Sequence, residues 1–283
     1  MTSFRLTFRK VVLIVFILSL QIPSISKAEK YLTTSEFATI GFGSAGMAVL
    51  GQLSLKIDTF RTPLIKGPLP LEKRLQYFLG GECTIDKTNF LDNTIGSVYT
   101  PVGGGLIMFV ADLTWPQGDK NKTTSQDLYL YSTGLFATKG LTGLIKGIVA
   151  RERPIKYLEP EIAAQRKNID FSSDYHSFFS GHTSSSFYAV TFVNKRLRSM
   201  MRSRMSGSTY KSWRWLPPTI LYSWASFVGW SRINVWKHYI SDVLVGATVG
   251  YLMAELYYSF GEDIFADQKG QANTTVFKIT ISF

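Results

Sequence analysis

The sequence places two chemically capable side chains, His238 and Asp242, four residues apart in the stretch 231–242. If this stretch is helical, both side chains lie on one face and are close enough to interact. A carboxylate that holds one imidazole nitrogen fixes the tautomer and leaves the other nitrogen free to attack. Arg232 would hold an anion in front of that nitrogen. A structural histidine with satisfied hydrogen bonds is the alternative, and this stretch alone does not decide between them.

Two earlier stretches favour the chemical interpretation. One contains Lys146 and Arg153, and the other is Ser180-Gly181-His182. The guanidinium of arginine makes forked contacts to phosphate oxygens. A serine-glycine turn that opens a helix offers a hydroxyl and backbone N–H groups to an anion. Because phosphoryl transfer depends mainly on positioning and positive charge, the three stretches together predict a phosphate site.

The spacing of these residues resembles the pattern of the type-2 phosphatidic acid phosphatase and vanadium haloperoxidase superfamily. That pattern is Lys, six residues, Arg-Pro; then Pro-Ser-Gly-His; then Ser-Arg, five residues, His, three residues, Asp. The sequence matches all three parts and departs from them at Phe179, where the family has proline. The resemblance extends over about residues 93–260, and the superfamily includes bacterial lipid phosphate phosphatases and class A acid phosphatases.

The resemblance assigns roles that agree with the chemistry of the side chains. His238 is expected to be the nucleophile and to form a phosphohistidine, with Asp242 orienting it. His182 is expected to protonate the leaving oxygen and then to activate water. Three cations and a turn are expected to bind the phosphate: Lys146, Arg153, Arg232, Ser180 and Gly181. No cluster has metal-ligand spacing, so we expect neither a metal nor a cofactor.

Only a fold can bring these stretches together, because 25 residues (155–179) and 48 residues (183–230) separate them. The apolar segments predict an all-α bundle of about six helices, with the active site at one rim and the basic run 195–214 at the opposite end. The expected helices are at 36–55, 93–115, 128–150, 181–197, 217–230 and 238–259. A polar turn is expected at 117–126 and a polar loop at 155–178.

The two ends of the chain carry patterns of their own. Residues 1–28 resemble a secretory signal, with a basic start, the apolar run 11–20 and small residues at Ser26 and Ala28. An uncleaved anchor is the alternative. Residues 274–283 alternate as a strand does, which predicts a short β extension. The expected division is a signal at 1–28, a helical and loop region at 29–92, a catalytic domain at 93–260 and an extension at 261–283.

Composition narrows the choice of partners. The net charge is +11, but the basic residues follow no nucleic-acid-binding pattern, so we expect a lipid surface or a phosphate substrate and no nucleic acid. Cys83 is the only cysteine, which excludes an internal disulfide. Nothing in the sequence indicates an oligomeric state.

Topology leaves two possibilities, an inner-membrane enzyme of the bacterial cell envelope and a soluble periplasmic enzyme. The positive-inside rule places the run 195–214 in the cytoplasm and therefore the site on the periplasmic face. A cleaved signal would start the mature chain outside, so one apolar segment should not span, and 36–55 is the expected one. The mean hydropathy of +0.06 favours the soluble form, whereas the basic loop and the apolar last helix favour the membrane.

The sequence therefore predicts a metal-independent phosphatase that acts on lipid phosphates or diphosphates through a phosphohistidine. Three alternatives remain: a soluble, non-specific periplasmic acid phosphatase that acts on small phosphoesters, a vanadate-dependent haloperoxidase and a non-catalytic helical envelope protein. The complete set of histidines, aspartate and arginines argues against the last of these.

Overall fold

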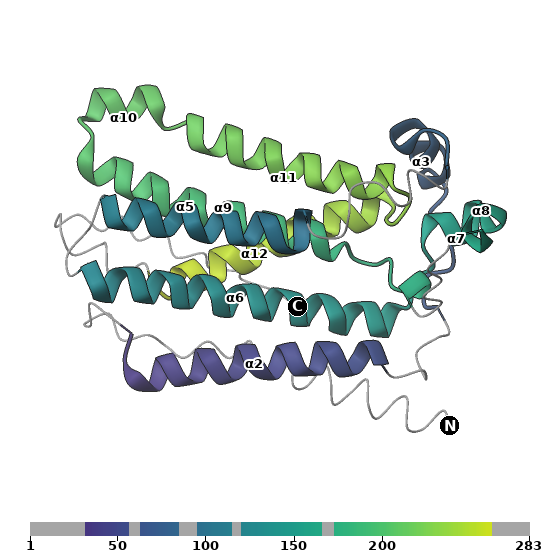
Figure 1. Cartoon of the computed structure of the whole chain (residues 1–283), viewed down its shortest axis with the longest axis horizontal. Coiled ribbons are helices and arrows are strands. Elements are labelled where there is room, and N and C mark those ends of the chain that lie inside the picture. The colour runs from purple at the N-terminus through teal and green to yellow at the C-terminus, as the bar shows by residue number, and fades with distance from the viewer. Residues whose placement is uncertain (1–31, 57–62, 85–94, 115–119, 166–172, 262–283) are drawn as a thin grey trace, which may run out of the picture.

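The structure, a computed structural model, describes residues 32–56, 63–84, 95–114, 120–165 and 173–261. Within these ranges the chain forms helices and no strand, which confirms the all-α prediction. The expected signal at 1–28 and the strand-like tail at 274–283 lie outside the described residues. Six long helices form the bundle: α2 (Thr34–Lys56), α5 (Thr100–Thr114), α6 (Lys120–Val149), α9 (Gly181–Arg204), α11 (Leu216–Asn234) and α12 (Ile240–Ser259) (Figure 1).

Shorter helices lie at the two ends of the bundle. At one end are α3 (Glu72–Gly80), α7 (Pro154–Leu158) and α8 (Pro160–Ala164), and at the other is α10 (Gly207–Trp213) (Figure 1). A π-helical turn, η2 (Ile95–Tyr99), leads into α5, and a 3-10 turn, η3 (Ser173–Tyr175), precedes α9. The basic run 195–214 forms the last turns of α9 and all of α10, opposite the end that carries α3. The predicted placement of that run is therefore confirmed.

Several expected boundaries were wrong. The segment 117–126 is not a turn throughout, because α6 already begins at Lys120. The helix expected at 93–115 begins as α5 at Thr100, directly after η2, with Pro101 in its first turn, where proline is tolerated. The stretch 155–178 contains α7, α8 and η3 rather than loop alone. Helix α12 begins at Ile240, so His238 lies in the connection before the helix and not on its first turn.

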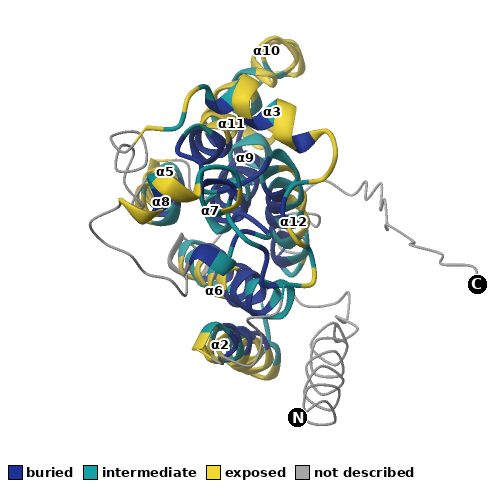
Figure 2. Cartoon of the chain, turned by 90° about the vertical axis from the view of Figure 1, so that its right-hand side faces the viewer, coloured by how far each residue is buried: buried dark blue, intermediate teal, exposed yellow. Residues whose placement is uncertain are grey.

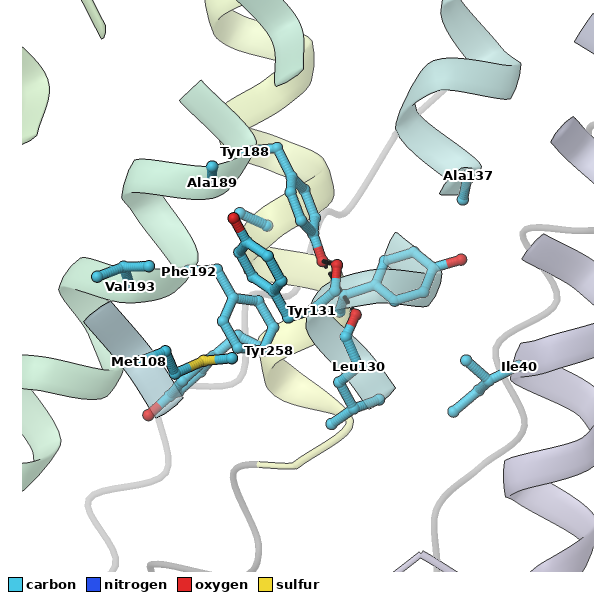
Figure 3. Close-up of a cluster of buried hydrophobic side chains, with 12 residues drawn as sticks. Ile40, Met108, Leu130, Tyr131, Ala137, Tyr188, Ala189, Phe192, Val193 and Tyr258 are labelled. Atoms are coloured by element: carbon cyan, nitrogen blue, oxygen red, sulfur yellow. Dashed lines mark hydrogen bonds between the residues drawn. The ribbon is translucent and has the colours of Figure 1, made fainter. Parts of the chain in front are cut away.

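Helix α9 is the centre of the bundle and packs against α5, α6, α11 and α12. Its inward face carries Tyr188 and Phe192, which are fully buried among aromatic side chains of α6 and α12 (Figure 3). The Tyr188 hydroxyl lies 3.0 Å from the carbonyl oxygens of both Leu130 and Tyr131, so the polar end of this ring is satisfied inside the core. This cluster fixes α9 against α6 and thereby sets the position of both helix ends that reach the site.

Helix α2 packs along α6 in the same direction, backbone against backbone. A Cβ atom at Gly51 would lie within 2.2 Å of the Gly140 carbonyl oxygen, so the contact requires glycine. Farther along both helices, the Ser54 hydroxyl donates to the Leu144 carbonyl at 3.1 Å. The expectation that 36–55 does not span is therefore not supported, because α2 lies along α6 (Figure 1) and is long and apolar enough to cross a membrane.

The outer faces of the bundle are apolar. Side chains such as Phe42 and Leu244 are 80% and 60% exposed, while the faces that meet at the centre are buried (Figure 2). Three helices in the described part of the chain are long and apolar enough to cross a membrane: Thr34–Lys56, Gly96–Thr114 and Ile240–Ser259. An exposed apolar surface of this extent is typical of helices that face lipid.

The end of the bundle near α10 is held by buried charge. Arg196 is fully buried, and its Nε and Nη2 lie 2.8 and 2.7 Å from Asp112 Oδ1. Its Nε also lies 2.7 Å from Asp127 Oδ2. This cluster joins α5, α6 and α9, because a buried guanidinium must be compensated by nearby carboxylates.

Candidate active site

The three sequence stretches meet at the end of the bundle that carries α3 and α7. The Ser180 backbone N–H donates to the Asp242 carbonyl at 3.0 Å, which joins the start of α9 to the start of α12. A Cβ atom at Gly181 would lie 4.0 Å from the Lys146 Nζ, which brings the end of α6 to the same place. The predicted meeting of these helix ends at one rim is confirmed.

The Ser180-Gly181 turn opens α9 toward the lysine. Ser180 is fully buried and caps the helix, since its hydroxyl oxygen accepts from the Thr183 N–H at 3.4 Å and from the Thr183 hydroxyl at 2.9 Å. Because the serine oxygen accepts both bonds, its own proton remains available to donate. His182 is half-buried and lies in the first turn of the helix, where backbone N–H groups favour an anion.

His238 lies in the connection between α11 and α12 and is 1% exposed. Its Nδ1 is 2.7 Å from the Ser177 carbonyl oxygen. A carbonyl can only accept, so Nδ1 must carry the hydrogen and Nε2 keeps a free lone pair. The loop itself is shaped by Arg232, whose carbonyl accepts from the Lys237 and His238 N–H groups at 3.2 Å each.

Asp242 does not bond the imidazole directly, contrary to the expectation from the spacing. Its Oδ2 is 3.8 Å from the His238 Nδ1, which is too long for a hydrogen bond. The same oxygen accepts from the Ser177 hydroxyl at 2.6 Å and from the Tyr239 N–H at 2.9 Å. Asp242 therefore orients the histidine through Ser177, the residue whose carbonyl holds the ring.

The surroundings of His238 keep it neutral. Burial lowers the pKa of its imidazole well below the ordinary value of 6.5, and the positive charges of Lys146, Arg153 and Arg232 lower that pKa further. The hydrogen bond to Ser177 acts in the opposite direction and is the weaker influence. A neutral imidazole beside three cations can attack an anionic phosphorus centre, because the cations offset the charge of the phosphate oxygens.

Two residues of this network were not predicted from the sequence. Ser177 acts through its backbone carbonyl, which carries no residue-specific signal. Arg151 is 1% exposed, and its Nη1 donates to Asp242 Oδ1 at 2.7 Å. It lies in the stretch from Lys146 to Pro154. The sequence signal for its role was that this stretch contains one arginine more than the family pattern requires. Among the described residues, no group of three or more His, Cys, Asp or Glu side chains could hold a metal ion.

A protein-family comparison agrees with this geometry. Residues 127–265 match the PAP2 superfamily model. This segment of the chain belongs to the PAP2 superfamily. The match begins within α6 and extends past the end of α12. It includes all the residues predicted for the site and leaves α2, α3 and α5 outside.

Several curated proteins are similar to this chain. Phospholipid phosphatase 2 of Homo sapiens is 27% identical over 186 residues, which are 57% of this chain and 61% of the human protein. Phospholipid phosphatase 1 of Mus musculus is 30% identical over 47% of this chain and 51% of the mouse protein. A probable diacylglycerol pyrophosphate phosphatase 1 of Schizosaccharomyces pombe is 34% identical over 30% of this chain and 29% of the yeast protein. The chain thus spans at most about three fifths of the length of these relatives.

One solved structure, that of Aquifex aeolicus LpxE, is similar to 68% of this chain over 96% of its own length. The two are 17% identical, with a TM-score of 0.36. At that score the two folds are not shown to be the same.

Proposed function

We propose that the protein is a metal-independent phosphatase that hydrolyses lipid phosphates or diphosphates through a phosphohistidine. The observation that carries the proposal is the state of His238. Its Nδ1 is held by a carbonyl, and its pKa is lowered by burial and by three cations, so that Nε2 is a neutral nucleophile. The catalytic domain would extend over about residues 93–260, so that α5 completes it.

The reaction takes two steps. In the first, Nε2 of His238 attacks phosphorus, the bond to the leaving oxygen breaks, and His182 gives that oxygen a proton. In the second, His182 takes a proton from water as the water oxygen attacks phosphorus, and the bond from phosphorus to Nε2 breaks, which releases phosphate and returns His238 to its neutral form. Lys146, Arg153 and Arg232 hold the phosphate oxygens throughout, together with the opening of α9 at Ser180 and Gly181.

Support for a lipid substrate comes from the surface of the bundle and from its relatives. Three helices of the described chain have the length and hydropathy of membrane spans. The similar proteins are named as phospholipid phosphatases and as a probable diacylglycerol pyrophosphate phosphatase. We infer that the substrate presents its phosphate at the membrane surface, where the end of the bundle with α3 and α7 lies.

The basic run 195–214 supports a periplasmic site. It lies at the end of the bundle with α10, opposite the end with α3 and α7 (Figure 1), and segments rich in lysine and arginine remain on the cytoplasmic side. The site would then face the periplasm of a bacterial cell envelope.

Phosphate release by the purified full-length protein tests the proposal. The substrates are phosphatidic acid, phosphatidylglycerol phosphate and a polyprenyl diphosphate in detergent micelles, with p-nitrophenyl phosphate as a soluble ester and excess chelator in every assay. We expect release of phosphate from at least one lipid and loss of this activity in His238→Ala. Activity should be retained in the control His176→Ala, which changes a half-buried histidine between η3 and α9. Release from the soluble ester alone would refute the lipid assignment, and an active His238→Ala would refute the mechanism.

A further inference from the structure

Arg151 is buried between two carboxylates that come from different parts of the chain. Its Nη1 donates to Asp242 Oδ1 at 2.7 Å, and its Nη2 donates to Glu72 Oε2 at 2.5 Å. Glu72 is 4% exposed and Asp242 is fully buried. The guanidinium also lies 4.1 Å from the centre of the Tyr239 ring. Three charges withdrawn from water are stable only while they compensate one another, so the position of each depends on the other two.

Glu72 also holds the start of the helix that carries Asp242. Its Oε1 accepts from the Ser241 N–H at 3.3 Å, in the first turn of α12. Arg151 donates to the Ser241 hydroxyl at 2.8 Å, so both members of the pair fix this turn. The glutamate is itself anchored, because its Oε2 accepts from the Leu69 N–H at 2.5 Å.

Helix α3, which carries Glu72, turns its polar side inward. Its buried residues are Glu72, Gln76 and Gly80, one turn apart, whereas Phe78 on the outer side is 83% exposed. Gln76 Nε2 donates to the Ile233 carbonyl at 2.9 Å, next to Arg232. A helix that buries glutamate and glutamine while exposing phenylalanine is positioned by polar contacts rather than by hydrophobic burial. Those contacts are with the end of α11 and the start of α12.

We propose that Glu72 and Arg151 are positioning residues of the active site, an inference that rests on the proposed phosphatase function. The contacts run from Glu72 through Arg151 to Asp242, then to the Ser177 hydroxyl, and the Ser177 carbonyl holds the ring of His238. The site is thereby completed by α3, which lies outside the segment 127–265 that matches the superfamily.

Removing one charge from this network should affect the chemical step more than the binding of phosphate. Without the charge of Glu72, only Asp242 balances the guanidinium of Arg151. The Asp242 carboxylate, which fixes Ser177, then moves together with that guanidinium. A misplacement of a reacting group by about 1 Å costs up to about a hundredfold in rate. Lys146, Arg153 and Arg232 bind the phosphate oxygens directly, so their affinity for phosphate should be retained.

The test compares Glu72→Gln with the parent protein, using kcat and KM for the best lipid substrate and the inhibition constant of inorganic phosphate. Glutamine keeps the size of the side chain and one carbonyl oxygen. We expect kcat per folded protein to fall about tenfold while the phosphate inhibition constant changes less than twofold. The matched control is Glu152→Gln, next to Arg151 in sequence, where a partly exposed carboxylate pairs with Lys156 at 4.0 Å. This control should change neither constant.

A second variant, Arg151→Lys, keeps the positive charge but loses the forked geometry. It should lower kcat as Glu72→Gln does, and the double variant should lose no more than about the larger single loss, because the two residues act in one chain. Folded fraction and melting temperature are measured for every variant. If Glu72→Gln does not fold, Arg151→Lys gives the same comparison of kcat with phosphate inhibition.

The outcomes separate the inference from the proposed function. Parallel losses of kcat and of phosphate affinity would overturn the positioning role. So would a kcat equal to that of the parent once folded fraction is taken into account, since that result assigns the pair to stability alone. If the parent protein releases no phosphate from any substrate, both the proposed function and this inference are overturned.

Discussion

The acid side of the pH profile should be set by the protonation of His238, and changing one neighbouring charge should move it. Burial and the charges of Lys146, Arg153 and Arg232 hold the pKa of this imidazole well below 6.5. Arg153→Gln removes one of the like charges. Two other cations and burial remain, so we expect the pKa of His238 to rise toward its ordinary value without reaching it. Each pH unit by which the acid limb moves would correspond to about 1.4 kcal/mol between the two protonation states.

The sign of the effect follows from the need for a neutral nucleophile. When the pKa of His238 rises, the imidazole becomes protonated at a higher pH, so the acid limb of kcat/KM should move to higher pH. This ratio is measured because it reports the ionisation of the free enzyme. The maximum of kcat/KM should also fall, since Arg153 is one of the residues that we propose to bind phosphate.

The control for this experiment is Lys156→Gln, which removes a positive charge from the same region of the chain. Lys156 lies 3.4 Å from the centre of the Tyr175 ring and pairs with Glu152. Its substitution should leave the acid limb in place. An acid limb that is unchanged in Arg153→Gln, or that moves to lower pH, would refute the assignment of His238 as the neutral nucleophile.

Three further predictions concern the leaving group, the metal and the packing of α2. His182→Ala should slow hydrolysis of alkyl esters far more than of p-nitrophenyl phosphate, because a good leaving group needs no acid; equal losses on both would exclude that role. Activity should persist in excess chelator and be inhibited by vanadate. Loss of activity on adding chelator, with recovery on adding a divalent ion, would contradict the mechanism. Gly140→Ala should lower the melting temperature, since its Cβ would lie 2.4 Å from the Met47 carbonyl oxygen. Gly43→Ala, where no atom lies within 4 Å, should not, and an equal melting temperature for both would refute the close packing.

The spacing of residues predicted the location of the site better than its internal contacts. Lys146, Ser180 and His238 are recognisable because their side-chain types recur at fixed separations, and the structure brings their stretches to one rim. The bond that orients His238 was predicted wrongly. Spacing suggested Asp242, whereas the structure shows the carbonyl of Ser177. A backbone carbonyl is present at every residue, so only the folded loop determines which one meets the ring.

The fold class was predictable for a similar reason. Long apolar segments without strand periodicity indicate helices, and the number of long helices followed from them. The role of α3 was not predictable in the same way. From its sequence alone, this short helix would be predicted to bury Phe78 and expose Glu72. The structure shows the opposite orientation. The partner that explains the buried glutamate, Arg151, lies 79 residues away in the chain.

The parallel course of α2 and α6 constrains where the chain enters and leaves the bundle. The Leu32 N–H donates to Gln126 Oε1 at 3.2 Å, and a Cβ at Gly261 would lie 3.6 Å from the Nε2 of the same glutamine. Both ends of the described bundle therefore lie beside the start of α6, far from His238. In a bilayer crossed by all six long helices, Leu32 and Gly261 would emerge in the same compartment, across the membrane from His238. With the site on the periplasmic face, this arrangement places Leu32 on the cytoplasmic side. Cleavage of the predicted signal would instead release the mature terminus on the periplasmic face, so the two conflict.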